Sequence, residues 1–168
     1  MQNIILIGMP GCGKTTIGKL LAQKLNREFI DSDKVFEETI CPDITEYFST
    51  NGEDDFRREE TKILRKLSQK NNCIIATGGG VVERPENKEI LQSGGTVVFI
   101  DRNPEDIYGD IDTTIRPILL ANGKDRIFTL YDRRYEKYRD YCHIRTENTG
   151  TLEEIAEKII NEVNQYNG

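Results

Sequence analysis

The sequence predicts an α/β fold in which a parallel sheet is covered by helices on both faces. Short β-branched runs alternate with segments of helical spacing along the chain, and this alternation is typical of parallel sheets. A phosphate-binding motif also lies between the first expected strand and the first expected helix. The 168 residues are enough for one domain with a hydrophobic core, and no linker divides them. We therefore expect a single domain over residues 1–168.

The first half of the chain begins with a strand and continues with helices. The run NIILIG at residues 3–8 is rich in β-branched side chains, as expected of a buried strand. After it, apolar residues recur at helical spacing, among them Ile17, Leu21 and Leu25. The next strand, EFID, precedes two short helices and one long amphipathic helix. We expect these elements at residues 14–25, 28–31, 33–40, 44–50 and 54–69.

The second half repeats the alternation. The apolar runs CIIAT and TVVFID are interpreted as strands, and Pro104 opens a short helix because proline suits the first helical turn. The closing helix begins after Thr151, which forms a capping box with Glu154. A weak edge strand precedes that helix. We expect strands at residues 73–77, 96–101 and 142–146, and helices at 86–92, from 104, at 125–141 and at 151–163.

The composition favours a soluble protein in a reducing compartment. Hydrophobic residues make up 36% of the chain and charged residues 31%, and no apolar run approaches the roughly 18–20 residues of a membrane span. The N-terminus lacks the features of a signal peptide, and the four cysteines show no CxxC spacing. The net charge of −6 argues against nucleic-acid binding. We expect a cytoplasmic monomer that binds neither nucleic acid nor membranes.

The strongest chemical signal is GMPGCGKT at residues 8–15, which fits the pattern GxxxxGK[ST] between a strand and a helix. Glycines let such a loop wrap a phosphate chain with its backbone amides. We expect Lys14 to reach the β- and γ-phosphates of ATP, and the hydroxyl of Thr15 to bind Mg²⁺. A chance glycine-rich turn is the alternative, which the strand–loop–helix context disfavours. The expected ATP-binding residues are Gly8, Met9, Pro10, Gly11, Cys12, Gly13, Lys14, Thr15 and Thr16.

Two aspartates follow the second strand, in the stretch FIDSDKVFEE at residues 29–38. We expect this strand to adjoin the strand before the phosphate loop, so that both open on one crevice. Asp31, nearer the loop, suits the Mg²⁺ shell, directly or through water. Asp33, further out, suits the acceptor hydroxyl as a catalytic base or an orienting group. The alternative is that Asp33 caps the following helix.

Further short motifs follow the phosphate loop in a fixed order: DSD at 31–33, FRREE at 56–60, GGG at 78–80 and RP at 116–117. Each motif is weak alone, but the series resembles shikimate kinase over nearly the whole chain. The resemblance implies a P-loop kinase of the nucleoside-monophosphate-kinase type, with a five-stranded parallel sheet flanked by helices. It also implies ATP, Mg²⁺ and phosphorylation of the 3-hydroxyl of shikimate, a step toward aromatic amino acids.

The long helix places a charged pair on its apolar side. At about 100° per residue, Phe56 and Ile63 share one face, Glu60 falls within it and Arg57 lies at its border. Charged side chains are rarely buried unless paired, and residues three apart on a helix can touch. We expect Arg57 and Glu60 to form an inward-facing pair, and a surface pair at the helix edge is the alternative. The resemblance places the carboxylate of shikimate on Arg57.

The helix at 125–141 distinguishes between two adjacent arginines. Arg134 falls in the middle of the apolar face, whereas Arg133 lies among charged residues. A planar guanidinium suits a carboxylate, which it can bind through two parallel hydrogen bonds. The carboxylate-binding arginine of the resembled family lies four residues before a tyrosine and also maps to Arg134, with Tyr138 as that tyrosine. The two residues before Tyr138 are EK here, rather than the family's usual proline–leucine.

Three consecutive glycines, Gly78, Gly79 and Gly80, follow the third strand. Three glycines in a row make the backbone flexible in the unfolded chain, which disfavours folding. Positive φ angles or a close approach of the backbone are the usual reasons for such a run. Ligands bind at the carboxyl ends of parallel strands, so we expect this loop to contact the acceptor. A plain strand-to-helix turn is the alternative, although it rarely needs three glycines.

Residues 110–125 have little regular pattern and are interpreted as a mobile lid. Arg116 stands before a proline that restrains its backbone. A closing lid can carry an arginine onto the transferring phosphoryl group and exclude water. We therefore expect Arg116 to contact ATP and to join Lys14 and Asp33 as a catalytic residue. A solvated loop arginine is the alternative.

One departure from the resembled family lies in the nucleotide site. That family usually carries an arginine, associated with adenine, shortly before the lid arginine, and Asp110 stands there in this chain. A gluconate or nucleoside-monophosphate kinase would share the loop and the type of fold. A non-catalytic nucleotide-binding switch is an alternative of a different class. The presence of Lys14, Asp33 and Arg116 together favours an enzyme.

Overall fold

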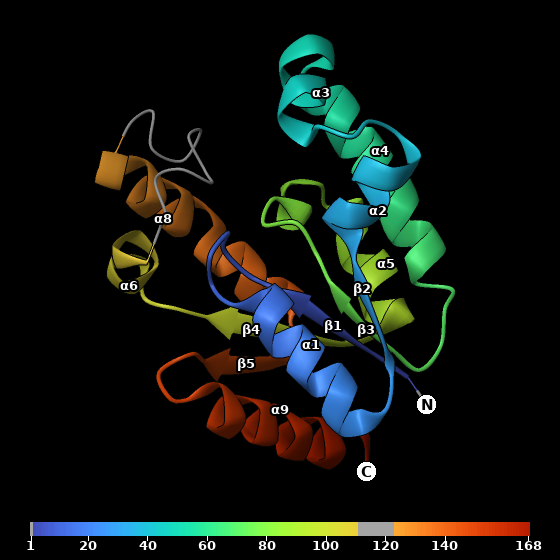
Figure 1. Ribbon diagram of the computed structural model, residues 1–168, viewed down its shortest axis with the longest axis vertical. Helices are drawn as coiled ribbons and strands as arrows, with labels where there is room; N and C mark the ends of the chain where they lie inside the picture. Colours follow the sequence, from blue (N-terminus) through green and yellow to red (C-terminus); the bar gives the residue numbers. More distant parts are fainter. Residues whose placement is uncertain (1, 111–122) are drawn as a thin grey trace.

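The computed structural model describes residues 2–110 and 123–168 of the chain. Its strands are β1 (Asn3–Ile7), β2 (Glu28–Asp31), β3 (Cys73–Ala76), β4 (Gly95–Asp101) and β5 (Ile144–Glu147). They form one sheet in the order β2-β3-β1-β4-β5, and all neighbouring strands are parallel (Figure 1). The predicted five-stranded parallel sheet is confirmed, and β5 is an edge strand as expected.

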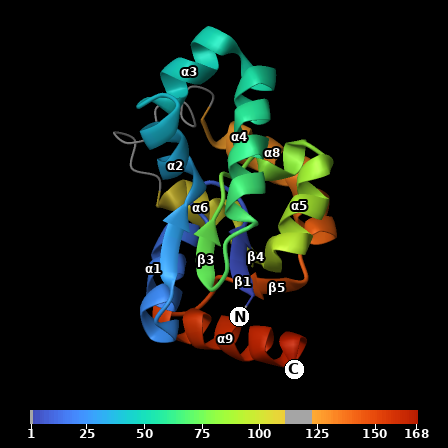
Figure 2. The ribbon, with the colours of Figure 1, turned by 90° about the vertical axis from the view of Figure 1, so that its right-hand side faces the viewer.

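Helices lie on both faces of the sheet. Those of the described residues are α1 (Lys14–Leu25), α2 (Ser32–Thr39), α3 (Ile44–Asn51), α4 (Glu53–Leu67), α5 (Glu86–Gly94), α6 (Pro104–Gly109), α8 (Gly123–Tyr141), α9 (Leu152–Asn167) and the 3₁₀ helix η1 (Val81–Glu83). Figure 2 shows α1 on one side of the strands and α5 and α8 on the other. Helices α1 and α9 contact each other, as do α4 and α5. None of these helices is both long and apolar enough to cross a membrane.

The core lies between the sheet and its two layers of helices. Every residue of β1, β3 and β4 is buried, and Ile17, Leu21 and Ile159 cover them from α1 and α9. A sheet that is covered on both faces has no solvent-facing positions in its central strands, so these strands are mostly apolar. The buried polar residues Asn3, Thr96 and Asp101 lie near the strand ends.

The strand order corrects one expectation, because β2 does not adjoin β1. Ile75 of β3 lies opposite both Ile5 of β1 and Ile30 of β2, so β3 separates the two strands. The reason lies in burial. All four residues of β3 are buried, whereas Ile30 is the one buried residue of β2 and Glu28 is exposed. A short strand of mixed polarity suits the edge of the sheet, and an apolar one suits the centre.

Most helix boundaries agree with the sequence. The capping box of Thr151 and Glu154 is present, although α9 continues to Asn167. Pro104 is in the first turn of α6. Helix α8 begins at Gly123, so the last residues of the interpreted lid belong to a helix. The remainder of that lid after Asp110, with Arg116, lies outside the described residues.

Candidate active site

The loop at residues 8–13 connects β1 to α1 and lies against the end of β4. Gly8 and Gly13 have φ angles of 145° and 103°, a region that residues with a Cβ rarely adopt. A Cβ on Gly8 would also stand 2.6 Å from the carbonyl oxygen of Ile100. Gly13 forms the N-cap of α1. The loop therefore brings its amides and the N-terminus of a helix to one place, as an anion-binding loop requires.

Lys14 is buried, and its ammonium group turns back on this loop. Nζ donates hydrogen bonds to the carbonyl oxygen of Gly8 at 2.7 Å and to that of Met9 at 2.8 Å. Sγ of Cys12 lies 3.7 Å from the same Nζ. The positive charge thus stays next to the loop, within reach of an anion bound there.

Two side chains that the sequence did not single out hold the outer part of the loop. Nη1 of Arg102 donates to the carbonyl oxygen of Gly11 at 3.2 Å, and Nδ2 of Asn148 donates to that of Cys12 at 2.8 Å. Binding these carbonyl oxygens from outside helps to direct the loop amides inward. Arg102 directly follows β4 and Asn148 directly follows β5. Their positions at the carboxyl ends of parallel strands are the signal that could have found them.

Asp110 also belongs to this arrangement. It is the C-cap residue of α6, and its carboxylate forms an ion pair with Nη2 of Arg102. The acidic residue that departs from the resembled family therefore binds the same arginine that supports Gly11.

Thr15 and Asp31, the two expected metal ligands, lie together. Oγ1 of Thr15 donates a hydrogen bond to Oδ2 of Asp31 at 3.1 Å. Oδ1 of Asp31 accepts from the backbone amide of Asp33 at 3.0 Å and so caps α2. The alternative that Asp33 is the cap is therefore wrong. Asp31 stands at the end of β2 with an extended backbone, the conformation that an N-cap requires.

Asp33 lies on α2 and lines a cavity that Pro10 of the phosphate loop also lines. Burial is the main cause that raises the pKa of its carboxyl group, and the charge of Asp31 adds to the shift. Lys14 and Arg57 act in the opposite direction, but the pKa remains above its ordinary value. A carboxylate with a raised pKa accepts a proton more readily, which a general base needs.

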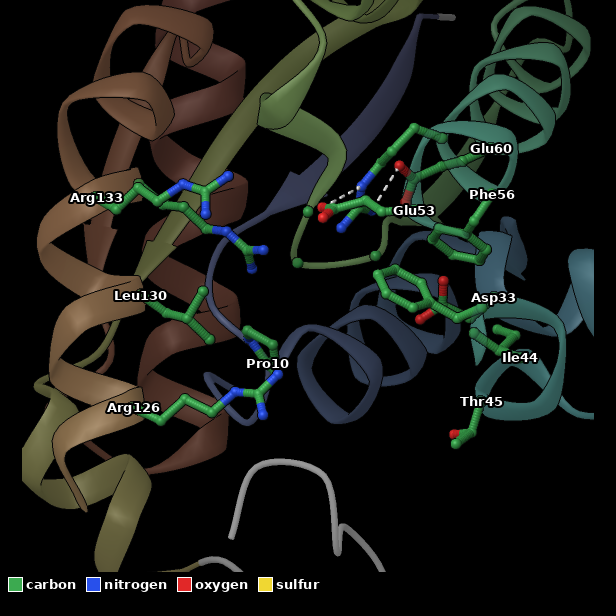
Figure 3. A pocket seen from close by; sticks show the side chains of 16 residues that line it. Pro10, Asp33, Ile44, Thr45, Glu53, Phe56, Glu60, Arg126, Leu130 and Arg133 are labelled. Atoms are coloured by element: carbon green, nitrogen blue, oxygen red, sulfur yellow. Dashed lines mark hydrogen bonds and ion pairs between the residues drawn. The ribbon is translucent and has the colours of Figure 1, made fainter. Parts of the chain in front are cut away.

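Arg57 and Glu60 form the inward-facing pair that the helix phase predicted. Nη1 of Arg57 donates to Oε2 of Glu60 at 2.9 Å, and the two residues are 8% and 4% exposed. Oε1 of Glu60 has no hydrogen-bond partner among the described residues. Burial raises the pKa of Glu60, although Arg57 opposes the shift. Figure 3 shows Glu60 beside Glu53 at one wall of the cavity.

The three glycines that follow β3 are explained by close approach. Within the described chain, positive φ angles occur at other glycines, not at these three. A Cβ on Gly79 would lie 2.6 Å from Cδ of Pro10, and one on Gly80 would lie 2.0 Å from Nη2 of Arg57. A Cβ on Gly78 would meet carboxyl oxygens instead. Each glycine therefore makes room for a different neighbour at the cavity.

Helix α8 buries Arg134 and exposes Arg133, as its phase predicted. The sequence did not reveal their common partner, Glu83, which accepts from Nε of Arg134 at 2.7 Å and from Nη2 of Arg133 at 2.9 Å. Arg133 also lines the cavity. Arg133, which the sequence places among charged residues, therefore also has a buried acidic partner and a place at the cavity.

Asp33, the pair Arg57 and Glu60, Arg134 and the loop Gly78–Gly80 line a cavity of about 410 Å³, a size that suits a small molecule. Figure 3 shows Arg126, Leu130 and Arg133 on one side and Asp33, Phe56 and Glu60 on the other. Its charged lining residues are four arginines and three acids, although the chain as a whole is acidic. The lining residues are Pro10, Asp33, Ile44, Thr45, Phe48, Glu53, Phe56, Arg57, Glu60, Gly78, Gly79, Gly80, Arg126, Leu130, Arg133 and Arg134.

Comparison with known proteins finds relatives that match nearly the whole chain. The family model described as shikimate kinase matches residues 10–164. A curated shikimate kinase of Clostridium botulinum (strain Alaska E43 / Type E3) is 48% identical over 160 residues, which cover 95% of this chain and 96% of that protein. A solved shikimate kinase from Acinetobacter baumannii, in complex with shikimate, has a TM-score of 0.92 and 34% identity. That match covers 98% of this chain and 94% of the other.

A gluconokinase from Sinorhizobium meliloti 1021 is a more distant structural match. Its TM-score is 0.65 at 14% identity, and the match covers 98% of this chain and 92% of the other. A likeness at this level of identity concerns the fold alone.

Proposed function

Because the chain belongs to the shikimate kinase family, we infer that it transfers the γ-phosphoryl group of ATP to the 3-hydroxyl of shikimate, a step of aromatic amino acid biosynthesis. The observation that carries this function is the cavity of about 410 Å³ beside the phosphate loop. Asp33 lines this cavity together with the two inward-facing arginines Arg57 and Arg134. The two arginines can bind a carboxylate group, and Asp33 can orient a reacting hydroxyl group.

The nucleotide is assigned to the phosphate loop, residues Gly8 to Thr16. We propose that Lys14 exchanges its contacts with the carbonyl oxygens of Gly8 and Met9 for contacts with the β- and γ-phosphates. Arg116 is proposed to contact the transferring phosphoryl group and stabilise its charge. The support for the roles of the loop and of Lys14 is the motif, the backbone geometry of the loop and the position of Lys14.

Thr15 and Asp31 are the proposed Mg²⁺ site. Their side-chain oxygens are 3.1 Å apart, and oxygen ligands of this kind fit Mg²⁺, which retains several waters and binds substrate phosphates as well. Mg²⁺ would neutralise part of the phosphate charge during transfer. The fit rests on the pair of oxygen donors next to the loop that would hold those phosphates.

The acceptor is assigned to the other side of the cavity. Arg57 and Arg134 bind its carboxylate, and the loop Gly78–Gly80 lies against its ring. Asp33 accepts the proton of the 3-hydroxyl group as that oxygen forms its bond to the γ-phosphorus. The bond between the γ-phosphorus and the β–γ bridging oxygen breaks, and ADP leaves with that oxygen.

One assay of ADP release tests this function. With ATP and Mg²⁺, we expect rapid release with shikimate and little release with gluconate, a nucleoside monophosphate or no acceptor. Faster turnover with gluconate or a nucleoside monophosphate would assign the chain to another small-molecule kinase. ATP binding without turnover on any acceptor would favour a nucleotide-binding switch.

The remaining proposals concern the state of the chain. We propose one domain over residues 1–168, acting as a monomer in the cytoplasm. One contiguous core joins both halves of the described chain, which supports a single domain. The four cysteines are unpaired, which supports a reducing compartment. Light scattering at working concentration would test the monomer.

A further inference from the structure

Glu83 connects the loop that follows β3 to helix α8 through three cationic side chains. It ends η1, which begins directly after Gly80. Its Oε1 accepts from Nε of Arg134 at 2.7 Å, and its Oε2 accepts from Nη2 of Arg133 at 2.9 Å and from Nζ of Lys137 at 3.0 Å. We refer to Glu83, Arg133, Arg134 and Lys137 as the Glu83 cluster.

Burial separates the members of the Glu83 cluster into two kinds. The side chains of Glu83 and Arg134 are 7% and 9% exposed, whereas those of Arg133 and Lys137 are 56% and 41% exposed. If a buried ion pair breaks, both charges stay buried without compensation from water. The contact between Glu83 and Arg134 therefore constrains both side chains. The two exposed cations supply charge with far less constraint.

The contact with Glu83 involves Nε of Arg134 and not its two terminal nitrogens. Glu83 engages Nε, whereas a carboxylate is bound bidentately by parallel N–H groups of the guanidinium. Arg134 lines the cavity and Glu83 does not. Glu83 therefore holds Arg134 from the side of the guanidinium that faces away from the cavity. A long side chain that is fixed in this way loses less conformational entropy when it binds a ligand.

The two exposed cations explain how Glu83 supports Arg134 without cancelling its charge. Burial alone would raise the pKa of Glu83, but hydrogen bonds from Arg134, Lys137 and Arg133 lower it to about 2. The carboxylate is therefore ionised at neutral pH. Three cations against one anion leave the Glu83 cluster with two positive charges in excess. A negatively charged acceptor thus still meets a positive wall.

We propose that Glu83 is a positioning residue for acceptor binding, which fixes the guanidinium of Arg134 while Arg133 and Lys137 offset its own charge. The proposal rests on the proposed function, because it takes the carboxylate of shikimate as the ligand of Arg134. Glu83 acts through Arg134 alone in this view.

The first test is Glu83→Gln, which keeps the shape of the side chain and removes its charge. We expect KM for shikimate to rise about 5- to 20-fold, with KM for ATP changed less than about twofold. Glu86→Gln is the matched control, since Glu86 forms a surface pair with Arg84 at 2.9 Å. The control is expected to match wild type. An unchanged KM for shikimate in Glu83→Gln would overturn the proposal.

A double-mutant cycle distinguishes positioning from a general structural effect. If Glu83 acts through Arg134, adding Glu83→Gln to Arg134→Ala should raise KM for shikimate no further. A rise by the same factor in both backgrounds would overturn the proposal, because it would mean that Glu83 acts by another route.

Glu83→Asp is a second variant that does not depend on the fold tolerating a neutral residue. It keeps the negative charge and draws the oxygens back by one methylene, so we expect KM for shikimate to rise about 3- to 10-fold. Wild-type KM in this folded variant would contradict the positioning role. Turnover of the wild-type chain separates the two conclusions, because its absence with shikimate would contradict the proposed function itself.

Discussion

Asp33 and Glu60 converge on one glycine: a carboxyl oxygen of each lies 2.9 Å from the point that a Cβ on Gly78 would occupy. The two side chains come from different helices, α2 and α4. Burial is the first cause of the raised pKa of each. A residue with a Cβ at position 78 would force these carboxyl groups to move, so glycine is required there by its neighbours rather than by its own backbone angles.

The first prediction concerns the chemical role of Asp33. Asp33→Asn should keep the fold and ATP binding while kcat falls about 100-fold or more, as expected for the loss of a general base. Steady-state kinetics with shikimate, together with nucleotide titration, measure both quantities. A kcat close to that of wild type would eliminate Asp33 as the base.

The second prediction uses the close contact between Gly80 and Arg57. A Cβ on Gly80 would stand 2.0 Å from Nη2 of Arg57. Because that atom ends a flexible side chain, we expect Gly80→Ala to displace the guanidinium and to leave the fold intact. The value of kcat/KM for shikimate should fall about 10- to 100-fold, with KM for ATP unchanged. Gly109→Ala is the control, because a Cβ there meets nothing within 4 Å.

The third prediction separates the two contacts of Asp31. Asparagine caps helices about as well as aspartate, so Asp31→Asn should preserve the cap on α2 and the melting temperature. It should raise the Mg²⁺ concentration needed for half-maximal rate, because a charged metal ligand is lost. A Mg²⁺ titration that coincides with that of wild type would remove Asp31 from the metal shell.

The fourth prediction compares the adjacent arginines of α8. Arg134→Ala should lower kcat/KM for shikimate about 10- to 150-fold, the loss expected for a charge-assisted contact of ~1.5–3 kcal/mol. Glu83 keeps Arg133 and Lys137 as partners in this variant, so the fold should survive. Arg133→Ala should change the same value less than about threefold, because the side chain of Arg133 is 56% exposed and Glu83 keeps Arg134 and Lys137 as partners. The reverse order would mean that Arg133 binds the acceptor.

The fifth prediction concerns stability in acid. The pKa of Glu83 is lowered in the folded protein from 4.5 to about 2. Its ionised form therefore stabilises the fold fully above the unfolded pKa, and this contribution is lost as the pH falls from about 4.5 toward 2. The difference in melting temperature between wild type and Glu83→Gln should be large at neutral pH and should shrink near pH 3. A difference independent of pH would contradict the assigned ion pairs.

Local features of the site could be read from the sequence because they repeat with the period of a helix. That period decides that Arg134 is buried and Arg133 exposed, and that Arg57 meets Glu60 three residues away. The phosphate loop could be predicted as well, because its glycines adopt backbone angles that the motif itself requires.

Contacts between distant parts of the chain could not be read in this way. Glu83 is 51 residues from Arg134, and Asn148 is 136 residues from Cys12. No periodic pattern connects such pairs, because they meet only after the sheet has formed. The position of β3 between β1 and β2 could not be predicted for the same reason. Strand order depends on which strands are buried on both faces, and the connection from β1 to β2 does not determine that.

The two carboxylate oxygens of Asp31 make two different contacts. Oδ2 meets Thr15 at the phosphate loop, and Oδ1 holds the start of α2, the helix that carries Asp33. The phosphate loop and the start of α2 are therefore held by a single short carboxylate. A glutamate at this position would carry its oxygens one methylene further, so the contact with Thr15 or the cap of α2 would have to shift. The length of aspartate thus links the position of Asp33 to that of the phosphate loop.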